Sequence, residues 1–138
     1  MKKIIALMAT IVGLAIFSIV NVSGGKLPSV GYVLVGPHTD GGWSMRHHDG
    51  FQSLTKHGYK VGMVEMVPEA ESTKIFNKLA RKHDIVFATS FGYMDGMEKA
   101  AKKNSDTIFM HATGYKGNDT NFDNYGCMSY QARYLAGV

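Results

Sequence analysis

The stretch VGYVLVGPHTDGGW, residues Val30 to Trp43, decides the fold class of this chain. It begins as a short, mostly apolar and β-branched run, which is typical of a strand that a parallel sheet covers on both faces. Gly36-Pro37 then ends the strand, and a glycine-rich turn carries Asp40 and the single tryptophan of the chain, Trp43. Ligands of open α/β sheets bind beyond the carboxyl ends of the strands, so this turn lies where a small molecule would arrive.

Strands and helices alternate along the rest of the chain. Apolar and helical spacings predict strands at 30–35, 59–67, 84–89 and 107–112, and helices at 44–57, 74–81 and 93–103. A polar loop from Gly114 to Asp123 precedes a fifth expected strand at Tyr125 to Ser129, and 131–138 has the pattern of an amphipathic helix. Parallel strands need crossovers of this length, so we expect an α/β fold with a doubly wound parallel sheet.

The first 24 residues have the anatomy of a secretory signal peptide. Lys2 and Lys3 precede an apolar run from Ile4 to Val20, and small residues follow at 22–24. We therefore expect a signal peptide at 1–24, a single domain at 25–138, and a periplasmic or extracytoplasmic location. The alternative is a retained membrane anchor, because the apolar run lies at the lower length limit for a spanning helix.

The single cysteine, Cys127, excludes an internal disulfide. It also lies far from the apolar run, so no lipid-anchoring cysteine follows that run. The formal net charge of +4 includes the two lysines of the expected signal peptide, and the other lysines are scattered. Nucleic acid is therefore not an expected partner.

Metal and catalytic motifs are weak in this sequence. The HHD run at 47–49 places neighbouring side chains about 100° apart on a helix, whereas helical metal pairs need i, i+3 or i, i+4 spacing. The other histidines are far apart, and we expect surface or capping roles for them: His38, His57, His83 and His111. No nucleophile motif is present. We expect no metal, no cofactor and no enzymatic activity.

Five side chains after the first and third strands suit a planar ligand. They combine flat apolar faces with carboxylate acceptors at strand ends: Asp40, Trp43, Phe91, Tyr93 and Asp95. The phosphate-binding glycine motifs are not present. Planar molecules that carry hydrogen-bond donors, such as purines, match this set. Core packing of the aromatic side chains and helix capping by the two carboxylates are equally compatible with the pattern.

Four segments carry a resemblance to a known family. They are 30–50 (VGYVLVGPHTDGGWSMRHHDG), 87–103 (FATSFGYMDGMEKAAKK), 109–116 (FMHATGYK) and 124–138 (NYGCMSYQARYLAGV). Together they resemble the basic membrane protein (BMP) family, which consists of extracytoplasmic substrate-binding proteins of ABC transporters. The resemblance is to the branch of purine and nucleoside binders, and it covers nearly all of the chain after residue 24.

The resemblance implies that residues 25–138 are the N-terminal α/β lobe of a type I periplasmic-binding-protein-like fold, in which two lobes close around a ligand. It implies a purine-like or nucleoside-like ligand and a membrane ABC permease as partners. The implied contacts are Asp40, Trp43, Phe91, Tyr93 and Asp95, with Tyr115 and Asn124 near the edge of the lobe. The second lobe would be missing from this chain. The alternatives are an α/β enzyme that acts on a small metabolite, with Asp40 or Asp95 as base, and a signal-anchored sensor domain.

Overall fold

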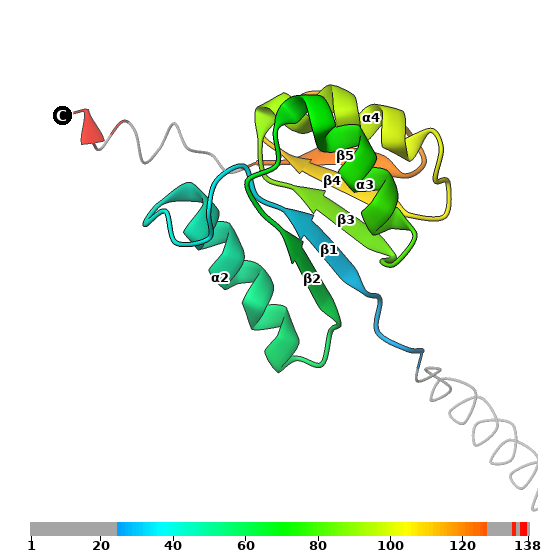
Figure 1. Ribbon diagram of the computed structural model, residues 1–138, viewed down its shortest axis with the longest axis horizontal. Coiled ribbons are helices and arrows are strands. Elements are labelled where there is room, and N and C mark those ends of the chain that lie inside the picture. The colour runs from blue at the N-terminus through cyan, green and yellow to red at the C-terminus, as the bar shows by residue number, and fades with distance from the viewer. Residues whose placement is uncertain (1–24, 127–133, 135, 138) are drawn as a thin grey trace, which may run out of the picture.

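A five-stranded parallel sheet forms the centre of the computed structural model, which describes residues 25–126, 134, 136 and 137. The strands are β1 (Val30–Val33), β2 (Val61–Val64), β3 (Ile85–Ala88), β4 (Ile108–Ala112) and β5 (Phe122–Tyr125). Their order in the sheet is β2-β1-β3-β4-β5, and each neighbouring pair is parallel (Figure 1).

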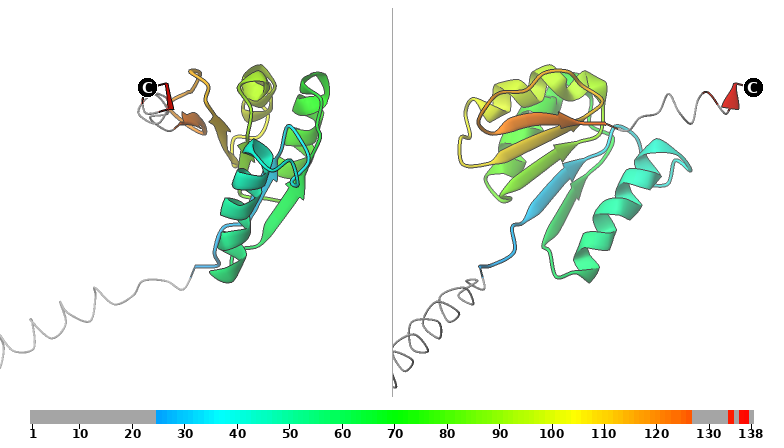
Figure 2. Two further views of the ribbon diagram at one scale, coloured as in Figure 1. Left: turned by 90° about the vertical axis from the view of Figure 1, so that its left-hand side faces the viewer. Right: turned by 180° about the vertical axis from the view of Figure 1, so that it is seen from behind.

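Helices cover both faces of this sheet. The helices are α2 (Trp43–Lys56), α3 (Ser72–Ala80) and α4 (Met94–Ala101), with short 3-10 turns η1 (Glu69–Glu71) and η2 (Phe91–Tyr93). Helix α2 lies on one face, and α3 and α4 lie side by side on the other (Figures 1 and 2). The predicted class, a doubly wound α/β fold, is confirmed.

The main hydrophobic core lies between the sheet and the pair α3 and α4. Phe76 on α3 and Met97 on α4 pack there against Val86 and Phe109, and all four side chains are fully buried. This agrees with the helical spacing in the sequence, which puts apolar residues on one side of each helix. On the opposite face, aromatic contacts join α2 to the sheet. The ring of Phe51 on α2 stacks on that of Tyr32 on β1 with centroids 4.3 Å apart.

The fifth strand begins earlier than the sequence predicts. It spans Phe122–Tyr125, whereas the expected strand began at Tyr125 and ran into residues that lie outside the described part. Phe122 is 2% exposed and pairs in register with Phe109 of β4. In β5 the side chain of Phe122 is buried while that of Asp123 next to it is exposed. The predicted start of this strand was wrong because the residues around Phe122 in the sequence are polar.

Two of the histidines are buried, which corrects the expectation of surface or capping roles. His111 is fully buried, and His83 is 9% exposed. The ring of His83 lies on the backbone of Gly31 and Gly62, which are paired in register on β1 and β2. A Cβ atom at Gly31 would come within 2.9 Å of this ring, and one at Gly62 within 2.7 Å, so both strands need glycine there. Burial lowers the pKa of His83.

The expected signal peptide at 1–24 and most of the expected helix at 131–138 lie outside the described residues. Among the residues that the structure does describe, no helix has the length and apolar character needed to cross a membrane.

Candidate functional site

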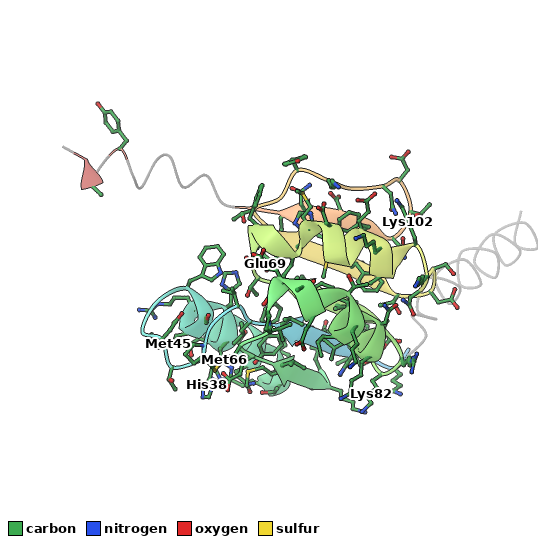
Figure 3. The ribbon with its side chains drawn as sticks, turned by 45° about the horizontal axis from the view of Figure 1, so that its top comes forward. His38, Met45, Met66, Glu69, Lys82 and Lys102 are labelled. Atoms are coloured by element: carbon green, nitrogen blue, oxygen red, sulfur yellow. The ribbon has the colours of Figure 1, made fainter. Side chains whose placement is uncertain are left out.

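The carboxyl edge of the sheet contains the point at which the strand order reverses. The chain passes from β1 outward to β2 and then returns to β3 on the other side of β1. The loops that follow β1 and β3 therefore diverge, and such a switch point is the ligand crevice of open α/β sheets. Figure 3 shows His38, Met66 and Glu69 toward this edge, and Lys82 and Lys102 toward the opposite end of the molecule.

Asp40 organises the loop between β1 and α2. Its carboxylate accepts hydrogen bonds from the backbone N–H groups of Gly42, Ser44 and Met45 at 2.8, 2.9 and 3.0 Å. These bonds, of which the one from Met45 contributes most, lower the pKa of the Asp40 carboxyl to about 2. The side chain thus satisfies free N–H groups at the start of α2, as a helix cap does.

Trp43 connects the two loops of the switch point. It is the first residue of α2, and its indole N–H donates a hydrogen bond to the backbone carbonyl of Thr89, directly after β3. The side chain remains 45% exposed, and its ring lies 4.4 Å from that of His47. Because the indole N–H is already bonded within the protein, Trp43 offers a ligand its ring face.

Phe91 and Tyr115 form a second exposed aromatic group at this edge. Phe91 starts η2 after β3 and is 54% exposed, and Tyr115 follows β4 and is 74% exposed. Their ring centroids are 6.1 Å apart with an interplanar angle of 51°. We call Trp43, Phe91 and Tyr115 the aromatic rim.

Asp95 and Asn124 lie beside the aromatic rim and converge on Lys116. The Lys116 Nζ donates to Asp95 Oδ1 at 2.7 Å and to Glu98 Oε2 at 2.9 Å. These two bonds raise the pKa of Lys116 above its ordinary value. The Asn124 side chain donates to the Lys116 carbonyl at 3.4 Å. Lys116, which was not among the predicted contacts, therefore links α4, β5 and the loop after β4.

Tyr93 lies beneath the aromatic rim. Its side chain is fully buried, its hydroxyl donates to the Val67 carbonyl at 2.6 Å, and its ring meets Phe76 edge-on at 5.6 Å. Burial raises the pKa of this phenol to about 12. In the described structure the side chain packs in the core, so we leave Tyr93 out of the ligand contacts proposed below.

His38 and Glu65 hold the loop after β1 from the other side. The Glu65 carboxylate accepts from the backbone N–H of His38 at 2.7 Å and lies 2.8 Å from its Nδ1. The bond from the His38 backbone, and to a smaller extent the bond with its imidazole, lower the pKa of Glu65. A signal for this contact was present in the sequence, since Glu65 is a charged residue immediately after an apolar strand.

A cavity of about 360 Å³ lies between α2 and the sheet, next to the aromatic rim. It is mostly apolar and is lined by Phe51, Leu54, Phe87 and Tyr125, with Arg46 and His47 at its polar side. Burial raises the pKa of Tyr125 to about 12. None of the predicted contacts is among its lining residues: Asp40, Trp43, Phe91, Tyr93, Asp95, Tyr115 and Asn124. Within residues 25–126, no group of three side chains suited to a metal ion occurs.

The chain has the fold of one part of solved ABC transporter solute-binding proteins. Its structure is similar to that of an ABC transporter solute-binding protein from Conexibacter woesei, with a TM-score of 0.68 and 18% sequence identity. The match covers 80% of this chain and 39% of that protein. The family model described as ABC transporter substrate-binding protein PnrA-like matches residues 27–138, and the chain belongs to this Bmp family.

Two relatives are similar over most of the chain. A purine-binding protein from Brucella abortus (strain 2308) is 40% identical over 114 residues, which is 79% of this chain and 32% of the relative. A Haloferax volcanii protein named as an ABC transporter glucose-binding protein is 33% identical over 118 residues, which is 83% of this chain and 30% of the relative. The chain thus spans about a third of their length. These similarities support neither the enzyme nor the sensor alternative.

Proposed function

We propose that this chain is a ligand-binding lobe of an extracytoplasmic solute-binding protein that delivers a small molecule to an ABC permease. Membership of the Bmp family supports the class of protein. The position of the aromatic rim at the switch point of the sheet supports the place of binding. Residues 1–24 would direct export as a signal peptide, and residues 25–138 would form the lobe. The protein would act by binding alone and would not transform its ligand.

The ligand that fits this edge best is a purine base or nucleoside. The observation that carries this assignment is Trp43, which is half-exposed and has its indole N–H bonded to Thr89, so that the flat face is presented to the crevice. Phe91 supplies a second face from the neighbouring loop. Stacking on aromatic side chains is the usual way to hold a planar base. The name of the Brucella relative points to the same ligand class.

Asp95 is the acceptor that we assign to the ligand, and Asp40 is a supporting residue. Asp40 already accepts three backbone hydrogen bonds, and a carboxylate offers about four acceptor sites. Asp95 is exposed, with one oxygen bonded to Lys116, and lies at the start of α4 near Phe91. Asn124 on β5 can contribute a side-chain amide to the same ligand.

A glucose-type ligand is the competing assignment, since one relative carries that name. Calorimetry on the protein encoded by the complete reading frame, with adenosine, guanosine and glucose, separates the two. We expect saturable heat with a nucleoside and a weaker response in the Phe91→Leu variant. Heat with glucose alone would overturn the purine assignment. Chemical conversion of a bound nucleoside, measured by mass spectrometry, would overturn the proposal that the protein only binds.

A further inference from the structure

We propose that His111 is a positioning residue, which holds the Tyr115–Lys116 segment in place beside the aromatic rim. This inference rests on the proposed function, because it assigns His111 a role in shaping the same site. His111 lies on β4 in register with Ala88 of β3 and Asn124 of β5, and its side chain is fully buried. Its ring stacks on that of Phe122 with centroids 5.2 Å apart and an interplanar angle of 27°.

The imidazole binds the loop through a backbone carbonyl. Nε2 of His111 lies 3.1 Å from the carbonyl oxygen of Lys116. A carbonyl accepts only, so Nε2 carries the hydrogen of this bond and Nδ1 carries the lone pair. Nδ1 is buried and has no hydrogen-bond partner within the described structure. The one polar contact of this buried ring is therefore directed at the loop.

The loop backbone lies directly against the imidazole at Gly114. A Cβ atom at Gly114 would lie 1.5 Å from Cε1 of His111, so no larger residue fits without displacing the ring or the loop. Thr113 just before it has a φ of 63°, which is uncommon for a residue with a side chain. The Thr113 N–H is bonded to the Tyr125 carbonyl at 2.8 Å. The ring and this turn together fix the path of the chain after β4.

This path determines where Tyr115 of the aromatic rim and Lys116 next to it lie. Both residues follow Gly114 immediately, and they reach Phe91 and Asp95 respectively. Loss of the bond between His111 and the Lys116 carbonyl would loosen both contacts, while Trp43 on the other loop would keep its own bond to Thr89. His111 does not reach the ligand itself, since it is fully buried.

Three substitutions test the role of the Nε2 hydrogen. In His111→Gln the amide nitrogen can reach near the position of Nε2, in His111→Asn it can reach near Nδ1, and His111→Phe keeps the aromatic ring without a donor. Amide hydrogen exchange of this chain without ligand is measured at Thr113 and Asn118, whose N–H groups are bonded to the carbonyls of Tyr125 and Phe122 on either side of the segment, with β3 as an internal control. We expect exchange at these two positions to rise about three- to tenfold in the Asn and Phe variants, as for loss of one hydrogen bond, and to stay near wild type in the Gln variant.

A milder variant covers the case in which the His111 variants do not fold. Asn124→Ala removes the second donor to the same carbonyl, and we expect a smaller rise confined to the same segment. Equal rises in β3 and at Thr113 and Asn118, or identical exchange in the Gln and Asn variants, would overturn the proposal. Local loosening without any nucleoside affinity in the wild type would leave the positioning role standing and would refute the purine assignment instead.

Discussion

The aromatic rim and the residues directly beneath it lie at the same edge of the sheet but have opposite environments. Trp43 and Phe91 are 45% and 54% exposed, whereas Tyr93 and His111 are fully buried. Phe91 and Tyr93 are only two residues apart. The Tyr93 hydroxyl and the His111 Nε2 each bond to a backbone carbonyl, and the rim leaves ring faces open to solvent. Ligand affinity and stability should therefore respond to different residues of the same short segments.

The largest expected difference in stability is between the alanine variants of two phenylalanines, Phe122 and Phe91. Phe122→Ala removes a buried ring of β5 and should lower the free energy of unfolding by about 3–5 kcal/mol, the range for such core truncations. Phe91→Ala, its control on the rim, should change stability much less because that ring is half-exposed. Urea denaturation measures both. Equal losses would show that the rim is part of the core.

Removal of the Tyr93 hydroxyl should have the next largest effect on stability. Tyr93→Phe leaves the buried Val67 carbonyl without this donor and should lower the free energy of unfolding by about 1–3 kcal/mol. Tyr115→Phe is the matched control, since that side chain is 74% exposed, and it should leave stability unchanged. A Tyr93→Phe variant with wild-type stability and reduced nucleoside affinity would return Tyr93 to the ligand contacts.

Trp43 should affect affinity more than stability. Trp43→Ala should weaken nucleoside binding by about 1–3 kcal/mol, the range for a base stacked on an aromatic side chain. Trp43→Phe keeps a ring face and removes the bond to Thr89, so it should recover part of the affinity. Calorimetry measures both variants. A loss of folding in Trp43→Ala, with no separate loss of affinity, would favour the core-packing interpretation of this residue.

The smallest expected effect concerns Asp40 and pH. The pKa of its carboxyl is about 2 in the folded protein, below the ordinary 3.8 of an aspartate, chiefly because of the backbone bonds from Met45, Gly42 and Ser44. The folded value is the lower one, so the carboxylate stabilises the fold above pH 4, and this contribution is lost as pH falls toward 2. Wild type should thus be more stable than Asp40→Asn at pH 5, and the difference should shrink by pH 2. A pH-independent difference would contradict the capping role.

The sequence was sufficient for the architecture. Buried strands of parallel sheets are apolar runs, and Phe76 and Leu79 recur at helical spacing, so the alternation of elements could be read from residue types. The predicted position of β5 was wrong because Phe122 is surrounded in the sequence by Asn and Asp residues, which also favour turns. An edge strand with one exposed side gives a weak pattern.

The candidate site was predictable only in part. Residues at strand ends could be selected, because parallel strands end at the same edge. Whether Tyr93 faces out or in depends on the η2 turn, and Asp40 caps α2 through bonds that depend on loop geometry. His111 looked like a surface residue because burial of a histidine needs a specific partner, here a carbonyl five residues away whose position depends on the folded loop.

The most direct test of the account is the fluorescence of Trp43 during titration with adenosine or guanosine. Trp43 is the single tryptophan of this chain, and a parallel titration of the Trp43→Phe variant identifies its share of the emission. On the protein encoded by the complete reading frame, the account predicts a saturable change in emission, shifted to higher nucleoside concentration in the Phe91→Leu variant. Unchanged emission across the nucleosides, with or without heat of binding, would contradict the placement of a purine at this edge of the sheet.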